Sequence, residues 1–311
     1  MHIPWKVLNY PAGEKISMDL NLERFQGRTR VGSAWANTTQ SDQPQLMGYW
    51  EGVVPPRRAW KPRLQTLVYA APEWNRGRTE FRSGADFRFQ PTPTLTALAS
   101  VNPDFRNIEQ QVAGVDFTRT ERYLEDARPF FSEGVDYFRL GQGFAFGNMF
   151  YSNRIGAMDY GAKAFGRLNP STSVGVLTAI DTGNAVANVA RIRSNFGAFS
   201  NADLYATTSD TPTGPQNTAV GGHGWKRWGN WWADTELASE LRAGRTDTAG
   251  SFGMGYEVPG WFGVLRGMWI EPKFDPDLGF IPWTDGEATS TASASPSIGR
   301  GRFATHTLGS T

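Results

Sequence analysis

Cysteine is absent from this chain of 311 residues. The absence excludes a disulfide framework, a thiol nucleophile and a thiolate metal site. An excess of charge is also lacking, because 31 Lys and Arg face 30 Asp and Glu and leave a formal net charge of +1. No strong overall field of either sign is therefore expected to recruit nucleic acid or acidic lipid.

Long apolar runs are missing as well. The mean hydropathy is -0.44, and no apolar run reaches the roughly 18 residues that a conventional transmembrane helix requires. A transmembrane β-barrel is not excluded, because its alternating strands barely register on hydropathy. The start, MHIPWKVLNY, has no apolar core of a secretory signal. We therefore expect a cytoplasmic chain, a removed leader or a true beginning further upstream.

Glycine and every-other-residue apolar patterns are abundant instead. The 35 glycines disfavour helices, since each interior glycine costs a helix about 1 kcal/mol relative to alanine. Alternation predicts strands. We predict an all-β chain, either an antiparallel β-barrel or a large curved antiparallel sheet, preceded by a small β-sandwich remnant. The expected strands are 15–25, 29–37, 46–53, 63–70, 81–89, 95–101, 159–168, 173–181, 188–194, 202–208, 233–242, 252–258 and 262–270.

Turn-forming clusters separate these runs and suggest hairpins. They include Asn169-Pro170-Ser171 and Asp181-Thr182-Gly183-Asn184. A stiff Pro55-Pro56 break divides residues 1–56, the end of a sandwich, from residues 57–285, the barrel or partial barrel. Residues 286–311, rich in Ser, Thr and Ala at first, are predicted to be a disordered tail.

The stretch 102–141 is dense in both charged and aromatic residues. Mixed charge and ring character suits a crowded polar lumen. We therefore expect this stretch to be a strand followed by a folded loop or plug.

Three motifs in order resemble a family of bacterial envelope proteins. They are VNPDF at 101–105, RPFFSEG at 128–134 and FYSNRIG at 150–156. Members of that family join an N-terminal domain like the family 9 carbohydrate-binding module to a C-terminal outer-membrane β-barrel of unknown function. The resemblance implies that the region up to about Pro56 is the end of the carbohydrate-module-like domain. It also implies a bacterial envelope location, at the outer membrane or a periplasm-facing membrane surface.

Catalytic signals are weak. The three histidines are far apart in sequence, His223 is expected in an exposed loop, and no metal site or cofactor is predicted. Glu133 and Asp136 are the most tempting carboxylate pair for glycoside chemistry. Ion pairing with Arg119, Arg122 or Arg128 in a lumen or loop explains them better, because a buried unpaired carboxylate is costly. We predict no catalytic residue.

Aromatic residues give the best binding hypotheses. Trp35, Tyr49 and Trp50 could stack on sugar faces, although strand tryptophans more often belong to a core. A second group is interleaved with Lys and Arg in a predicted polar loop. It suits a membrane-interface belt or a partner-binding patch, which the sequence does not separate. Its members are Trp225, Trp228, Trp231 and Trp232.

Three functions remain open at this stage. The first is a non-enzymatic outer-membrane-type β-barrel protein, or part of one, with a glycan-binding N-terminal segment. The second is an accessory structural subunit that docks on a larger membrane protein complex. The third is a glycan-acting enzyme. The expected partners are membrane lipid or a membrane complex and carbohydrate, and nucleic acid is not expected.

Overall fold

The structure is a computed structural model, and it divides the chain into two compact units. The described residues are 5, 15–28, 31–35, 48–56, 61–75, 78–105, 123–141, 147–196, 200–258, 261–281, 287–296 and 308–310. The first unit comprises 1–62 and 91–94, and the second comprises 63–90 and 95–311. Each is described by itself.

The first unit contains two small antiparallel sheets. Strand β1 (Ile16–Leu20) pairs with β4 (Gly48–Val53), and β2 (Glu23–Gln26) pairs with β3 (Val31–Ala34). They lie in the region where the sequence predicts the end of a β-sandwich.

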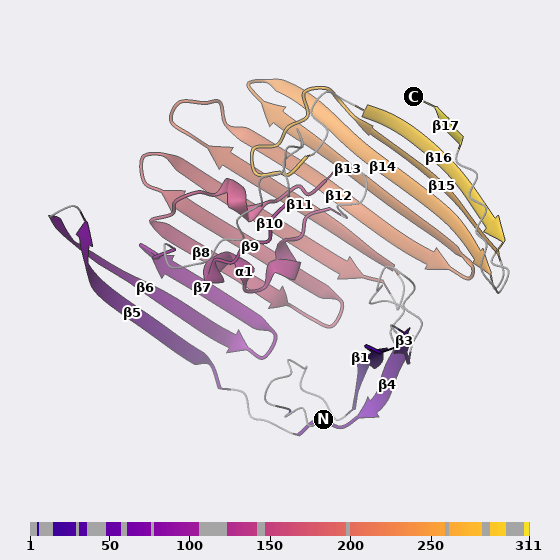
Figure 1. Cartoon of the computed structure of the whole chain (residues 1–311), viewed down its shortest axis with the longest axis horizontal. Helices are drawn as coiled ribbons and strands as arrows, with labels where there is room; N and C mark the ends of the chain where they lie inside the picture. Colours follow the sequence, from indigo (N-terminus) through magenta and orange to yellow (C-terminus); the bar gives the residue numbers. More distant parts are fainter. Residues whose placement is uncertain are drawn as a thin grey trace. The chain divides into compact units, whose positions relative to one another are not determined.

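The second unit is built on one antiparallel sheet of 13 strands, shown in Figure 1. Each strand pairs with the next along the chain, so the sheet is a continuous up-and-down meander. The strands are β5 (Arg63–Asn75), β6 (Arg78–Thr92), β7 (Leu95–Val101), β8 (Tyr160–Arg167), β9 (Thr172–Asp181), β10 (Ala185–Asn195), β11 (Ser200–Asp210), β12 (Asn217–Trp228), β13 (Trp231–Arg242), β14 (Arg245–Val258), β15 (Trp261–Ile270), β16 (Glu287–Pro296) and β17 (Leu308–Ser310).

The predicted all-β class is confirmed, in the form of a large antiparallel sheet. Among the described residues the sheet is open, because its order begins with β17 and ends with β5. Strand β12 was not predicted, since its glycines and tryptophans resembled a loop. The disorder expected over 286–311 is wrong for β16, which pairs with β15 over ten consecutive positions. Small side chains are enough to form this strand, because backbone hydrogen bonds pair it with β15.

Local sequence explains the hairpin turns. The Asn169 side chain accepts hydrogen bonds from the amides of Ser171 at 3.0 Å and Thr172 at 2.9 Å, which closes the turn between β8 and β9. Gly183 stands in the turn between β9 and β10 with a φ of +82°, a left-handed conformation that glycine adopts without steric cost.

The core lies on one face of the sheet, which we call the inner face. Two segments pack there (Figure 1). The inner segment, residues 123–141 and 147–158, contains α1 (Pro129–Ser132), η3 (Val135–Phe138) and η4 (Ser152–Arg154). The second segment is 271–281. The buried cluster combines side chains from both segments with inward strand residues, among them Phe130, Phe138, Leu140, Met149, Phe165, Leu177, Val189, Tyr205, Phe274 and Leu278.

Candidate functional site

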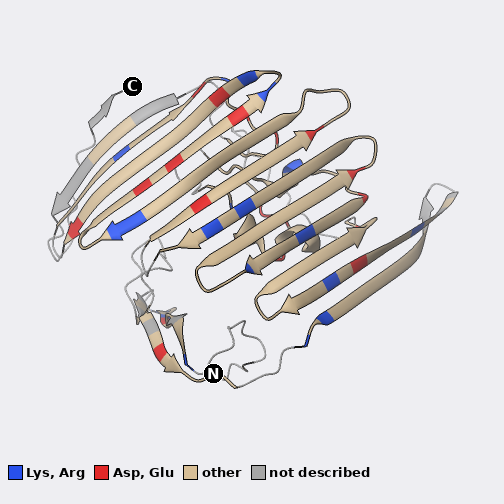
Figure 2. Cartoon of the chain, turned by 180° about the vertical axis from the view of Figure 1, so that it is seen from behind, with Lys and Arg blue, Asp and Glu red and all other residues tan. Residues whose placement is uncertain are grey.

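The strand register places nearly all charged residues of strands β7–β15 on one face of the sheet. Residues opposite each other in neighbouring strands share a face, and the pairing is continuous from β7 to β15. Figure 2 shows the charged positions along these strands. Those on the inner face are Lys163, Arg167, Asp181, Arg191, Arg193, Asp203, Arg227, Asp234, Glu236, Glu240, Arg242, Arg245, Asp247, Glu257 and Arg266.

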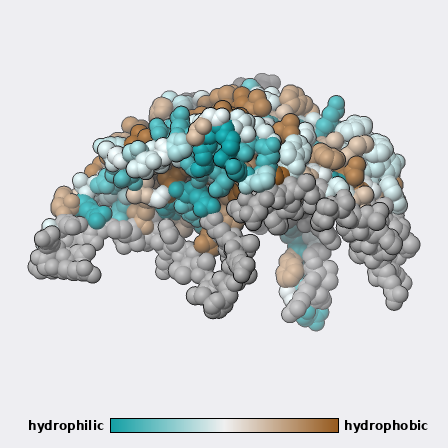
Figure 3. Space-filling model, turned by 90° about the horizontal axis from the view of Figure 1, so that it is seen from above, coloured by the Kyte–Doolittle hydropathy of each residue, from teal (hydrophilic) through white to brown (hydrophobic). Residues whose placement is uncertain are grey.

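The opposite, outer face is almost uncharged. In β7–β15 only Lys226 and Asp210 have outward positions, and Asp210 is the last residue of β11. The exposed outward side chains are mostly large and apolar. Those at outward positions include Val176, Ile192, Leu204, Val220, Leu237, Phe252, Met254, Leu265 and Trp269. Figure 3 shows that brown hydrophobic residues lie at the surface of the described part of the chain, beside teal hydrophilic ones.

Asp203 is the centre of an ionic network on the inner face. Its carboxylate accepts a hydrogen bond from Nε of Arg191 at 2.8 Å and lies 3.4 Å from Nδ1 of His223. His223 is 4% exposed in strand β12, so its predicted place in an exposed loop is wrong. Next to this network the Tyr205 hydroxyl donates to Glu236 at 2.7 Å. Pairing of this kind is what permits charged groups to be buried.

Backbone carbonyls of the inner segment are bound by basic side chains of the sheet. Nη1 of Arg191 donates to the carbonyl of Asp136 at 2.8 Å, and Nζ of Lys163 donates to that of Glu133. The Lys163 ammonium also lies 5.2 to 5.4 Å from the centres of three aromatic rings, those of Phe130, Phe138 and Phe165. The sheet therefore holds α1 and η3 through charged and aromatic contacts together.

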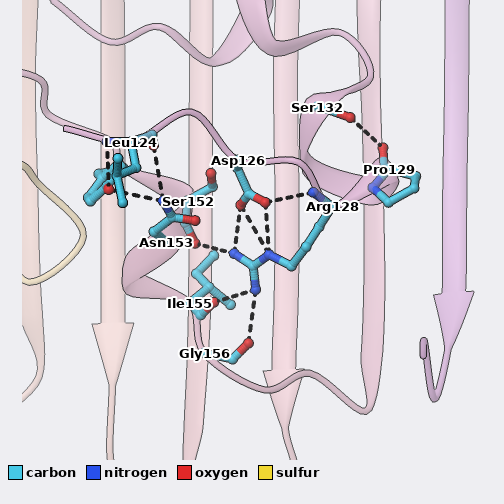
Figure 4. Close-up of polar contacts among 10 residues, drawn as sticks. Leu124, Asp126, Arg128, Pro129, Ser132, Ser152, Asn153, Ile155 and Gly156 are labelled. Atoms are coloured by element: carbon cyan, nitrogen blue, oxygen red, sulfur yellow. Dashed lines mark hydrogen bonds and ion pairs between the residues drawn. The ribbon is translucent and has the colours of Figure 1, made fainter. Parts of the chain in front are cut away.

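Arg128 fixes the fold of the inner segment itself (Figure 4). Its guanidinium pairs with the Asp126 carboxylate at 2.6 Å. Its Nη1 donates to the carbonyls of Ile155 and Gly156 at 2.7 and 2.9 Å, and its Nη2 donates to that of Ser152 at 2.8 Å. The side chain is 3% exposed, and these contacts join the start of α1 to the loop that follows η4.

The predicted ion pairs have other partners than expected. Glu133 pairs with Arg88 of β6 at 2.9 Å, and Asp136 pairs with Arg139 at 3.5 Å. Arg119 lies outside the described residues, as does Arg122. Arg88 was missed because it comes from a strand 45 residues away, a separation at which sequence spacing gives no signal.

An aromatic cluster joins the inner segment to the second packed segment. The Tyr123 ring lies 4.9 Å from that of Tyr151 and 5.4 Å from that of Phe280. Burial raises the pKa of the Tyr123 hydroxyl above its ordinary value.

The hollow beside α1 has a volume of about 660 Å³. Its wall includes Leu67 and Tyr69 of β5, Leu98 of β7 and Phe130 of α1, and the ion-paired Arg88 and Glu133 also line it. Pockets for small molecules have this size and mostly apolar character. Among the lining residues, only Glu133 was singled out from the sequence, as one of the carboxylate pair considered for glycoside chemistry and assigned to an ion pair.

The tryptophan group predicted as a loop belongs to the hairpin of β12 and β13, and alternation divides it between the faces. Trp225 and Trp232 point inward and stack, with ring centres 5.2 Å apart. Trp228 and Trp231 are opposite each other on the outer face. They are 42% and 39% exposed. Of the four tryptophans, only these two lie on the exposed outer face, where a membrane-interface belt or a docking patch would be located.

The predicted sugar-binding residues of the first unit are exposed where the structure describes them. Trp35 is 58% and Trp50 is 49% exposed. A Cβ at Gly48 would lie 2.6 Å from the Trp35 ring, so only glycine there permits the ring's close approach. The side chain of Tyr49 lies outside the described part of the structure.

Within the described ranges, no group of three or more His, Asp or Glu side chains is arranged to hold a metal ion. None of the helices described is long and apolar enough to cross a membrane.

Part of the chain matches the model of a known family. Residues 55–197 match the family described as a domain of unknown function, DUF5916. The match covers the three sequence motifs, strands β5–β10 and the whole inner segment. No curated protein matches the chain.

Proposed function

We propose that this chain is a non-enzymatic, membrane-embedded β-sheet protein of the outer-membrane type, either a barrel or part of one, in the bacterial cell envelope. The outer face of the sheet would contact lipid. The inner face would enclose a polar lumen occupied by the inner segment.

The observation that carries this proposal is the segregation of charge between the two faces of β7–β15. Lipid-facing positions of membrane β-proteins are apolar, and lumen-facing positions are polar. In a water-soluble protein whose sheet is covered by other segments on one side, the uncovered face contacts water and is therefore polar. Here the free face is the apolar one, with Leu204 66% and Leu237 55% exposed.

Outward aromatic residues at one end of strands β12–β15, beside the hairpin turns, support the same function. The ring of Trp231 lies 4.8 Å from that of Tyr256, which in turn lies 5.8 Å from that of Trp261. Tryptophan and tyrosine gather at the level of lipid headgroups. The row they form continues to Trp228 and would mark the membrane surface.

The family match and the motif resemblance support the finer part of the proposal. We infer that the second unit corresponds to the outer-membrane barrel domain of the envelope family that the motifs resemble. The first unit would be the end of its carbohydrate-module-like domain. The exposed rings of Trp35 and Trp50 would then provide a glycan-binding surface.

Because the chain has no cysteine, single-cysteine variants test the lipid-facing role directly. Ser239→Cys places a label on the outer face of β13, and Ser173→Cys places one on the inner face of β9. After reconstitution in vesicles, a lipid-borne nitroxide should quench a fluorophore at position 239 strongly. Aqueous iodide should quench one at position 173. Equal lipid quenching at both positions would contradict the proposal.

A second candidate function is an accessory subunit of a membrane complex. The feature that favours it is the open order of the sheet among the described residues, with β5 and β17 at its ends, since free strand edges can pair with another chain. In that case the label at position 239 should be shielded from both quenchers, and only when the protein is assembled with its complex.

A further inference from the structure

Lys226 is an exception on the outer face. It lies on β12 two residues before Trp228, which is about 7 Å along a strand. Its cross-strand neighbours are Ser200 of β11 and Ala233 of β13. Apart from Asp210 at a strand end, it is the charged residue that β7–β15 present outward. From one row inside the aromatic row, the flexible lysine stem can extend its ammonium back to lipid phosphates at the headgroup level.

A groove of about 590 Å³ begins at this lysine. Its outward lining includes Phe196, Ser200, Gly224, Lys226 and Thr235. Gly224 leaves it unfilled, because a Cβ built there would meet only the Thr235 methyl carbon among described atoms, at 3.8 Å.

The next row along β12 is covered by a leucine. Gly222 lies two residues further along β12, between Leu204 of β11 and Leu237 of β13. These two leucines are among the most exposed apolar side chains of the sheet. A Cβ at Gly222 would meet Cδ2 of Leu204 at 3.0 Å, so the Leu204 side chain already covers that position. The open space beside the ammonium is therefore the groove over Gly224.

We propose that this groove binds one anionic phospholipid, and the proposal rests on the function proposed above. Lys226 would bind the phosphate, with the Ser200 hydroxyl beside it as a hydrogen-bond donor. One acyl chain would lie over Gly224, against Phe196 and Thr235. The near-zero net charge of the chain gives no general attraction to acidic lipid. Any preference must therefore come from a local group.

The test uses the detergent-purified full chain, incubated with equal amounts of phosphatidylglycerol and phosphatidylcholine and examined by native mass spectrometry. The wild type should retain phosphatidylglycerol in about fivefold preference, the equivalent of about 1 kcal/mol. Lys226→Gln should abolish this preference.

Arg227→Gln is the matched control, because it makes the same charge change on the inner face, one residue away. It should keep the full preference, and an equal loss in both variants would overturn the proposal. Gly224→Val fills the groove in a strand-compatible way and should reduce retention of both lipids. Unchanged retention in that variant would contradict the placement of an acyl chain in the groove.

Soluble glycerol phosphate separates a lipid from a free phosphate as the occupant. It should fail to displace bound phosphatidylglycerol, and displacement would contradict a lipid site. Failure of this inference is distinguishable from failure of the proposed function. Lipid quenching at position 239 with no effect of Lys226→Gln rejects only the site, whereas absent quenching rejects the embedding.

Discussion

Buried charges in this protein are held by specific partners, and Arg128 is the clearest case. Its guanidinium is surrounded by the Asp126 carboxylate, three carbonyl oxygens and the ring of Phe131, whose centre is 4.2 Å away. Removing one partner of such a pair leaves the other charge buried without compensation.

Arg128→Met is therefore expected to lower the free energy of unfolding by about 3–5 kcal/mol. Denaturant titration of the detergent-solubilised protein measures this change. Arg139→Gln is the control, because the Arg139–Asp136 pair is largely exposed and should change stability by less than about 1 kcal/mol. Similar effects of the two changes would show that Arg128 does not fix the inner segment.

At the level of single elements, glycine determines how closely α1 and η3 approach the sheet. Gly134 joins them with a φ of +70°, and a Cβ there would overlap the ring of Phe165 in β8. Two separate costs are thus combined at one residue, a left-handed backbone and a close packing contact.

Gly183 allows these two costs to be measured apart. It has a similar φ of +82°, but a Cβ there would meet nothing within 4 Å. Gly183→Ala should destabilise by about 1–2 kcal/mol, the cost of the left-handed conformation alone. Gly134→Ala should cost about 1–3 kcal/mol more, because the added methyl group overpacks against Phe165. Thermal or denaturant unfolding measures both changes. Equal losses in the free energy of unfolding would mean that the inner segment shifts to accommodate the added methyl group without destabilising the protein.

On the scale of the whole molecule, the sheet has one face that its own chain covers and one that it leaves apolar. The inner face is packed by the inner segment and by 271–281, which is anchored where the amide of Asp277 donates to Asn217 at 3.1 Å. On the outer face the described residues leave Leu204 and Leu237 exposed, and under the proposed function this face needs an environment that favours apolar side chains over charges. A lipid phase provides such an environment.

Leu204→Arg tests this environment, since Leu204 lies within β11, away from both strand ends. In lipid, the arginine should destabilise the folded protein by about 2–4 kcal/mol. Thr213→Arg, in the turn between β11 and β12, should stay within about 0.5 kcal/mol of the wild type. Unfolding in vesicles measures both, and a neutral Leu204→Arg would argue that water covers this face.

Much of the fold was predictable because it is encoded locally. Alternation over Phe252–Val258 and Phe262–Ile270 places strands at β14 and β15, and Asn169 and Gly183 mark turns that the structure contains. Strand β12 was missed for the converse reason. The inward positions of β12 include His223 and Trp225, and those of β13 include Trp232. Glycines and basic residues between them obscured the alternation of apolar and polar positions.

The sequence by itself determined the all-β class, the hairpin meander and the density of charge and aromatic residues in the stretch before β8. These depend on the preferences of neighbouring residues. Only the tertiary structure decided that Glu133 pairs with Arg88, that Asp203 binds Arg191 and lies beside His223, and that the tryptophans divide between two faces. Those outcomes depend on register between strands and on packing of the inner segment, which bring together residues whose separation along the chain carries no local signal.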